Sequence, residues 1–130
     1  EAIWSKRYNQ INEFEIYLFE NNVKIIKLFF HISKEEQKKK LQNRINDPRK
    51  QWKFSEEDIL DRRLWDQYTI AQEEMLSKCS SKNIPWYIIP SDNKWFRNFA
   101  VAKIIINALD NMKLEFPKAK IDLSKIFIYD

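Results

Sequence analysis

Lysine and arginine are concentrated in one stretch of this chain of 130 residues. Residues 34–53 hold eight Lys or Arg against three Asp or Glu, a net charge of +5, whereas the whole chain carries only +4. Ammonium and guanidinium groups at this density bind and neutralise anions, phosphates among them. The stretch therefore predicts a partner that carries many negative charges.

The segment RINDPRKQWKFSEED, residues 44–58, has the groups best placed for chemistry. A helix must end at Asp47-Pro48, because the residue before a proline disfavours helical geometry. Arg44 comes just before that break, and an arginine at a helix end beside a hinge can reach phosphates with two parallel donors. Residues 38–40, all lysine, are better explained as a solvated face of the preceding helix.

The single histidine and the single cysteine exclude two kinds of site. His31 is better explained as the end of a strand than as a catalytic base, because no second histidine exists for a relay or a metal site. Cys79 has no partner for an internal disulfide and suits a reducing compartment. We therefore expect no metal site in this chain and a cytoplasmic location.

Two absences bound the function further. No run reaches the roughly 18 apolar residues of a membrane span, so we expect no membrane partner. The chain has no glycine, where an average usage of about 7% would give roughly nine. A phosphate-cradling GxxxxGK loop is therefore absent, because its backbone needs glycines to approach the phosphates. Together with Glu1 in place of an initiator methionine, this predicts an excised piece of a longer protein.

Two short apolar runs predict the strands that must position these groups. Residues 23–32 and 86–89 are rich in apolar side chains and too short for buried helices, so we expect strands covered on both faces. Because helices join them, they should pair in parallel. Two parallel strands alone make a poor sheet, so their other neighbours should come from outside this chain. The predicted fold class is part of an α/β fold.

Helices are expected before, between and after the strands. Ser33 with Glu36, and Ser55 with Asp58, have the spacing of a capping box. Ser91 or Asp92 is expected to cap the last helix. The predicted helices cover residues 2–20, a polar helix from Ser33 to the Asp47-Pro48 break, residues 55–79, and a last helix after residue 92.

The C-terminal tail, residues 118–130, places apolar residues at Ile121, Leu123 and the run IFIY. This pattern fits a short strand or an arm that contacts a neighbouring chain. The sequence leaves both interpretations open.

Several unusual sequence blocks occur in the order found in the polyphosphate kinase 2 family. Residues 1–117 resemble the C-terminal half of that family, whose members transfer phosphoryl groups between inorganic polyphosphate and nucleoside mono- or diphosphates. The DPxKxWKxSxxD pattern and the PW…DNKW…R block carry the resemblance most specifically. The matching blocks are RYNQINEFEIYL (7–18), HISKEEQ (31–37), RINDPRKQWKFSEED (44–58), WDQY (65–68) and IPWYIIPSDNKWFRNFAV (84–101).

The resemblance implies a three-layer α/β/α fold of the P-loop kinase class, similar to thymidylate kinase, with a lid at about residues 33–80. It implies that the glycine-rich Walker A loop and the Walker B aspartates, which hold phosphate and Mg²⁺, precede Glu1. Mg²⁺ would then be a cofactor of the full-length enzyme with ligands outside this chain. We expect this chain alone to bind no cofactor and to be inactive, and the enzyme to be a homo-oligomer.

The resemblance also assigns lid residues. Arg44 and Lys53 match lid positions expected to act in catalysis. Lys50 matches a phosphate- or nucleotide-binding position, and Arg49 lies beside it. Asp58 matches the family's aspartate after the WK pair and is expected to belong to the same binding surface.

Two further binding residues are expected at the start of the last helix. Lys94 and Arg97 match the basic pair that the family has beyond the carboxyl end of a strand, where α/β folds bind ligands. Lys40 departs from the family, which commonly has arginine near this position. A lysine keeps the charge but loses two-pronged binding, so we assign no role to it.

Two alternatives remain from the residues alone. The basic stretch suits a non-catalytic module that binds polyanions, nucleic acid included, but Trp52 is its only aromatic residue, so a series of stacking platforms is missing. The incomplete sheet suits an assembly piece that pairs its apolar faces with another chain. We expect polyphosphate and nucleotide as partners and disfavour nucleic acid.

Overall fold

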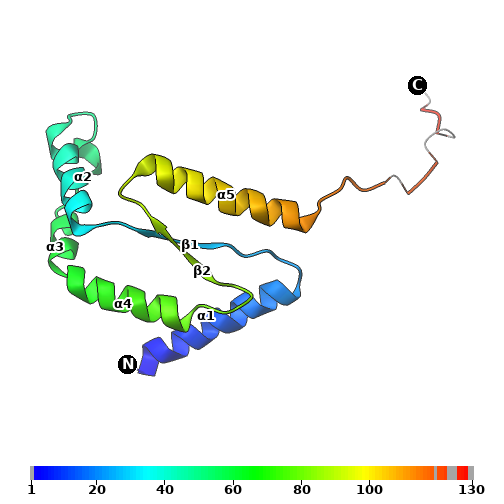
Figure 1. Cartoon of the computed structure of the whole chain (residues 1–130), viewed down its shortest axis with the longest axis horizontal. Coiled ribbons are helices and arrows are strands. Elements are labelled where there is room, and N and C mark those ends of the chain that lie inside the picture. The colour runs from blue at the N-terminus through cyan, green and yellow to red at the C-terminus, as the bar shows by residue number, and fades with distance from the viewer. Residues whose placement is uncertain (1, 119, 123–125, 129–130) are drawn as a thin grey trace.

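The computed structural model describes residues 2–118, 120–122 and 126–128. Helices precede, separate and follow the two strands, as the sequence predicts, but three α-helices rather than two lie between the strands (Figure 1). The elements are α1 (Ala2–Glu20), β1 (Lys27–His31), α2 (Lys34–Asn46), the 3₁₀ turn η1 (Gln51–Lys53), α3 (Glu57–Arg63), α4 (Trp65–Lys78), β2 (Trp86–Pro90) and α5 (Lys94–Met112).

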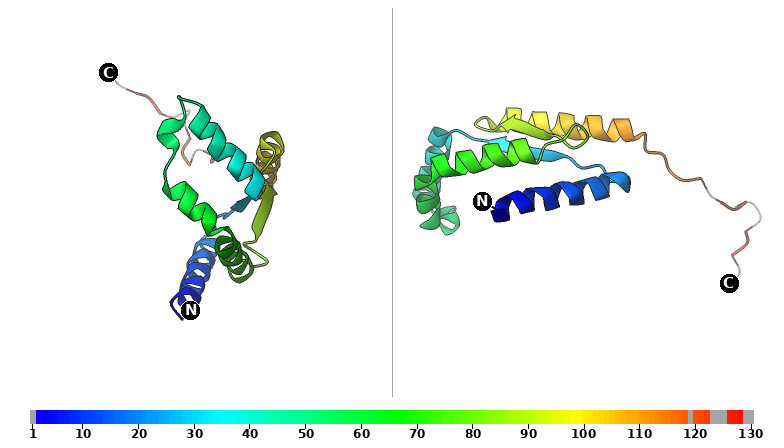
Figure 2. Two further views of the ribbon diagram at one scale, coloured as in Figure 1. Left: turned by 90° about the vertical axis from the view of Figure 1, so that its left-hand side faces the viewer. Right: turned by 90° about the horizontal axis from the view of Figure 1, so that it is seen from below.

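The sheet consists of β1 and β2, which pair in parallel with Lys27 opposite Trp86 and His31 opposite Pro90. Helix α5 lies on one side of the strands, whereas α1 and α4 lie on the other (Figures 1 and 2). The parallel pairing and the α/β class predicted from the sequence are confirmed.

Asparagine ends the first helix as its conformational tolerance predicts. The backbone of Asn22 has φ 63°, in the left-handed region that usually favours glycine, which this chain lacks. The side-chain amide of Asn21 donates to the Tyr17 carbonyl at 2.7 Å, so one of the last carbonyls of α1 gains a partner. The predicted bounds of this helix, residues 2–20, are confirmed.

Capping residues position the helices on either side of the strands, partly in an unexpected way. The Ser33 hydroxyl accepts from the Glu36 N–H at 3.1 Å, as the capping box predicts. The Ser33 N–H, however, donates to Asp92 at 2.8 Å rather than to Glu36. The prediction that Ser91 or Asp92 caps the last helix is therefore wrong, because Asp92 caps across the sheet and Asn93 serves as the N-cap of α5.

The prediction of one helix over residues 55–79 is wrong. The chain breaks at Leu64, where α3 ends and α4 begins in a new direction (Figure 1). Arg62 supplies the physical reason, because its guanidinium donates to the Lys34 carbonyl at 2.7 Å and to Gln37 at 2.9 Å and so fixes α3 against α2. This long-range contact overrides a continuous helical pattern.

Strand β1 is shorter than predicted, and both strands are more exposed than predicted. Residues 23–26 precede β1 without joining the sheet. Ile89 is buried, but Ile88 and Phe30 keep 57% and 49% of their surface exposed. The expectation that both faces are covered is therefore not met within this chain, because three helices cannot enclose both faces of a two-stranded sheet together with its open edges.

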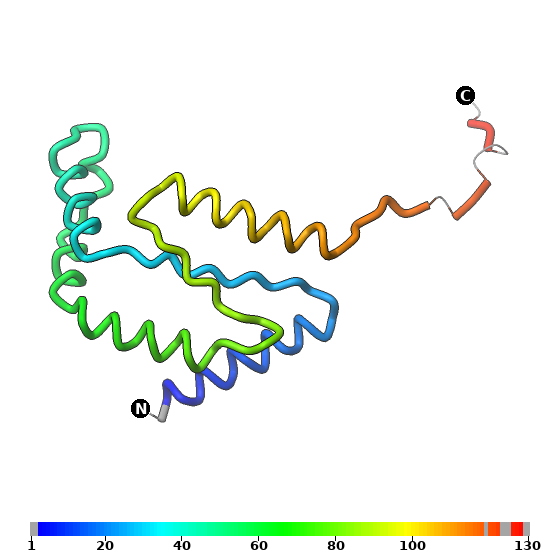
Figure 3. Tube along the Cα trace, in the orientation of Figure 1, coloured from blue at the N-terminus to red at the C-terminus, as the bar shows by residue number. Residues whose placement is uncertain are grey.

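Beyond α5 the trace leads away from the helices (Figure 3). The described residues there, up to 118 and within 120–122 and 126–128, form no strand. Leu123 and the tyrosine of IFIY, on which the alternating pattern partly rests, lie outside the described residues. Within the described part of the chain, none of the helices combines the length and apolar character needed to cross a bilayer.

Lys27 is a buried lysine that the sequence pattern did not single out, and it contacts residues of three other elements. Lys27, within an otherwise apolar run, is 8% exposed at the start of β1. Its ammonium group lies 2.6 Å from the Glu15 carboxylate of α1 and donates to the Cys79 carbonyl at the end of α4. The same group lies 5.3 Å from the centre of the Trp86 ring of β2. Burial also raises the pKa of the Cys79 thiol beside it.

Replacing Lys27 by Met should lower the free energy of unfolding by about 2–4 kcal/mol, because the Glu15 carboxylate would remain largely shielded from water without its cation. Urea unfolding followed by tryptophan fluorescence measures this loss. Lys24→Met, at an exposed lysine of the segment just before β1, is the matched control and should change little. The double variant Lys27→Met/Glu15→Leu should recover most of the loss. A single variant as stable as the wild type would contradict the assignment.

Candidate functional site

The two strands end at the same edge, and the two groups of predicted site residues follow from it in the chain. Helix α2 follows β1 and α5 follows β2, and the Ser91 N–H donates to the His31 carbonyl across the strand ends at 2.8 Å. The hydrogen bonds from Ser33 hold the pKa of Asp92 below its ordinary value. Parallel α/β folds bind ligands at this edge.

We call residues 34–63, which comprise α2, η1 and α3, the arm. It stands at the edge where the strands end, on the same side of the molecule as the start of α5 (Figure 1). Two contacts hold its two sides together, that of Arg62 described above and an ion pair between Arg44 and Asp58. The arm therefore presents its basic residues from a braced helical hairpin.

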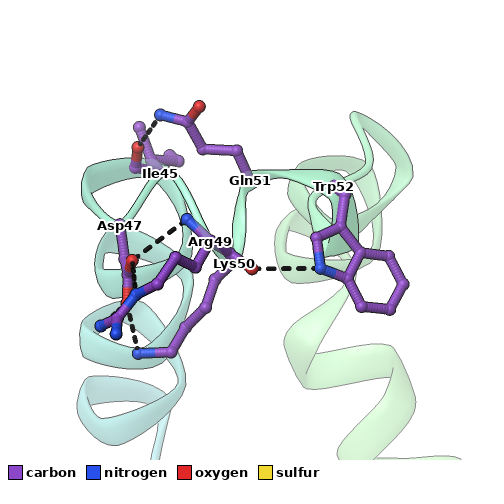
Figure 4. Close-up of polar contacts among 6 residues, drawn as sticks. All are labelled: Ile45, Asp47, Arg49, Lys50, Gln51 and Trp52. Atoms are coloured by element: carbon purple, nitrogen blue, oxygen red, sulfur yellow. Dashed lines mark hydrogen bonds and ion pairs between the residues drawn. The ribbon is translucent and has the colours of Figure 1, made fainter.

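At the turn between α2 and η1, one carboxylate holds two cations, and we call Asp47, Arg49 and Lys50 the tip cluster (Figure 4). Arg49 donates through Nε and Nη2 to the two oxygens of Asp47, at 3.1 and 3.2 Å. Lys50 Nζ lies 2.8 Å from one of the same oxygens. The structure thus brings the predicted binding residues Arg49 and Lys50 together.

The tip cluster keeps its carboxylate charged. The hydrogen bond from Arg49, followed by that from Lys50, lowers the pKa of Asp47 from 3.8 to about 2. Asp47 therefore remains an anion between its two cations at any pH near neutrality. The sequence pattern identified this residue only as a helix end.

The side chain of the predicted catalytic residue Lys53 contacts Trp52 rather than Asp47, although its backbone N–H donates to the Lys50 carbonyl at 3.0 Å. Its Nζ is 5.0 Å from the centre of the Trp52 ring, a cation–π distance. The Trp52 indole donates to the Arg49 carbonyl at 3.1 Å and remains 78% exposed, so the ring is fixed in orientation but open to solvent (Figure 4).

Arg44, the other predicted catalytic residue, is paired with the predicted binding residue Asp58. Arg44 Nη1 lies 3.3 Å from Asp58 Oδ2, and that oxygen also accepts from the Ser55 N–H at 3.3 Å. Only the reciprocal half of the predicted Ser55–Asp58 capping box is therefore formed, because the Ser55 hydroxyl accepts from the Glu57 N–H at 3.2 Å and Glu56 precedes α3 as its N-cap. Both side chains are about one-third exposed, so the ion pair is weak. Arg44 can therefore give up Asp58 and bind an incoming anion at little cost in free energy.

Lys94 and Arg97 lie on the first turn of α5, separate from the arm residues. Arg97 donates to Asn98 at 3.0 and 3.2 Å, and its guanidinium carbon lies 5.8 Å from the centre of the Phe30 ring of β1. Lys94 forms no ion pair with any of the described residues. The structure therefore places these two cations at the edge where the strands end, as predicted, but gives them no contact with the tip cluster.

A cavity of about 590 Å³ lies between the end of β1 and α4, lined in part by His31, Gln37, Thr69 and Glu73. None of the arm or α5 cations predicted to act on phosphate lines it. Among the described residues, no three His, Cys, Asp or Glu side chains are grouped as metal ligands.

Comparisons with known proteins point to one family. The model of "Polyphosphate kinase 2 (PPK2)" matches residues 1–117. An AMP/ADP-polyphosphate phosphotransferase of Meiothermus ruber is 41% identical over 128 residues, which are 98% of this chain and 48% of that protein. An uncharacterized protein in the chlN 3′ region of Leptolyngbya boryana is 49% identical over 115 residues, which are 88% of this chain and 85% of that protein.

A crystal structure gives the same result. Polyphosphate kinase 2 from Arthrobacter aurescens TC1 superposes with a TM-score of 0.91 at 39% identity, over 95% of this chain and 44% of that chain. This chain thus spans about half the length of the M. ruber and A. aurescens relatives. The resemblance read from the ordered sequence blocks is confirmed: the chain belongs to the polyphosphate kinase 2 family.

Proposed function

We propose that this chain is the lid-bearing part of a transferase that moves a phosphoryl group between inorganic polyphosphate and a nucleoside mono- or diphosphate. The arm carries the proposal, because it stands at the ligand-binding edge of an α/β sheet with Arg44, Arg49, Lys50 and Lys53 along it. The related M. ruber protein is named for transfer between polyphosphate and AMP or ADP.

The arm suits the demands of phosphoryl transfer. This reaction depends on the position of the phosphates and on neutralisation of their charge more than on a covalent nucleophile. A lid that closes with Arg44 and Lys53 over the phosphates supplies positive charge, and its closure excludes the water that would hydrolyse the donor. Lys94 and Arg97 supply charge from the first turn of α5 at the same edge.

The residues that the structure describes do not fit a Mg²⁺ site. Asp47 and Asp58, the carboxylates that pair with the arm cations Arg44, Arg49 and Lys50, are both occupied by those cations. We therefore derive no step through Mg²⁺ within this chain, and its ligands would belong to the rest of the enzyme. The same applies to the glycine-rich phosphate loop, because the chain contains no glycine.

Exposed apolar side chains support a larger assembly. Trp4 and Phe14 of α1, and Phe99 and Ile106 of α5, keep more than half of their surface open. The rest of the enzyme, or a second copy in a homo-oligomer, would cover these faces. The single cysteine supports the cytoplasm as the compartment.

Replacing Arg44 or Lys53 by Ala in the full-length enzyme should lower kcat/KM with polyphosphate roughly 30- to 10³-fold, about 2–4 kcal/mol, because one charged donor is lost from the transition state. Lys39→Ala is the matched control, since Lys39 is a solvent-exposed lysine of the same arm, and should change the rate little. Circular dichroism should show all three variants folded. Normal rates in both Arg44→Ala and Lys53→Ala would refute the lid assignment.

The 130-residue chain alone should bind long-chain polyphosphate without transferring a phosphoryl group, because the charge of the arm is present and the phosphate loop is absent. Fluorescence titration measures the binding, which should weaken as salt is added. Incubation with polyphosphate, ADP and Mg²⁺ followed by nucleotide analysis tests the transfer. Formation of ATP by this chain would contradict the proposal, and equal affinity for single-stranded nucleic acid would favour a general polyanion-binding module.

A further inference from the structure

We propose that Asp47 is a positioning residue that holds Arg49 and Lys50 as one paired cation site for neighbouring phosphates of a polyphosphate chain. The inference rests on the proposed function and extends it to a residue whose own charge is opposite to that of a phosphate-binding group.

The contacts of Asp47 exceed what a helix end requires. Its carboxylate accepts from Arg49 Nε and Nη2, from the Arg49 backbone N–H at 3.1 Å, and from Lys50 Nζ. Its backbone carbonyl accepts from the N–H groups of Lys50 at 2.8 Å and of Gln51 at 3.1 Å. Both the backbone of the turn and the two cationic side chains are therefore arranged around this one residue (Figure 4).

Burial shows which groups of the tip cluster face the ligand. The Asp47 side chain is 19% exposed, whereas those of Arg49 and Lys50 are 88% and 52% exposed. The anion thus lies on the inner side of the cluster, and the cations lie toward solvent. A polyanion that approaches the arm meets the cations first.

The pair keeps donors for a ligand while Asp47 holds it. A guanidinium has five N–H donors and an ammonium has three, and Asp47 takes two from Arg49 and one from Lys50. The remaining donors can reach two phosphates that share a bridging oxygen. Because the side chains are already ordered, less rotamer entropy is lost when phosphate binds.

A purely local role makes a different prediction. The hydrogen bond from the Arg49 N–H to Asp47 Oδ1 forms an Asx turn, which asparagine forms equally well. Asp47→Asn therefore preserves the turn and removes the charge that holds the two cations. It also makes the arm more positive by one charge, which alone would strengthen the binding of a polyanion.

The test compares the KM for polyphosphate in full-length enzymes. Asp47→Asn should raise this KM about tenfold while kcat changes little, because two side chains must be ordered on binding. Glu35→Gln, the matched control, removes one negative charge from an exposed position of the same arm and should leave KM unchanged or lower it. Asp47→Glu, which restores the charge, should recover part of the loss.

A spectroscopic measurement examines the cluster directly. In Arg49→Ala, the pKa of the Asp47 carboxyl, followed by ¹³C NMR, should rise from about 2 toward 3.8. An unchanged value would show that Arg49 does not hold Asp47 in solution and would overturn the inference.

The outcomes separate this inference from the function on which it rests. A wild-type enzyme that transfers no phosphoryl group from polyphosphate would refute both. An active wild type with an Asp47→Asn variant whose KM is unchanged or lower would refute the positioning role alone. A raised KM in Asp47→Asn with a normal Glu35→Gln enzyme would support it.

Discussion

The ammonium group of Lys27 lies where α1, β1, α4 and β2 converge, and the arrangement of the remaining elements depends on it. The group has three kinds of partner, the Glu15 carboxylate, the Cys79 carbonyl and the face of Trp86. A buried charge is tolerated only when such partners replace water, so the lysine fixes which elements must meet. The chain thereby sets the start of both strands, and with it the edge at which they end and from which the arm emerges.

Charge is organised differently in the arm. Acids hold every cation expected to act on phosphate between α2 and α3, apart from Lys53, which lies over Trp52. These pairs are more exposed than the pair of Lys27 and Glu15, so each contributes less to stability. The body of the chain thus uses a permanent ion pair for architecture, and the arm uses reversible ones that leave its cations ordered and available.

The sheet has exposed faces, and this chain matches only about half of two of its relatives. Ile88 and Phe30 remain about half exposed, and the chain corresponds to 44–48% of the A. aurescens and M. ruber proteins. Parallel strands are normally covered on both faces. Within the described residues of this chain, the two strands do not obtain that cover.

The sequence by itself determined the local elements and the family. Period and capping residues were sufficient for α1, for the start of α2 and for the parallel strands, and the ordered motifs were sufficient for the family. Tertiary contacts decided the rest, because they join residues far apart in the sequence. The contact of Arg62 with α2 explains why the predicted helix is interrupted at Leu64. Asp92 accepts from the N-cap of α2 instead of capping α5. Lys27 is buried although it lies in an apolar run. The fold likewise decided which cations of the arm lie together. Adjacency in sequence does not determine which groups long, flexible side chains contact.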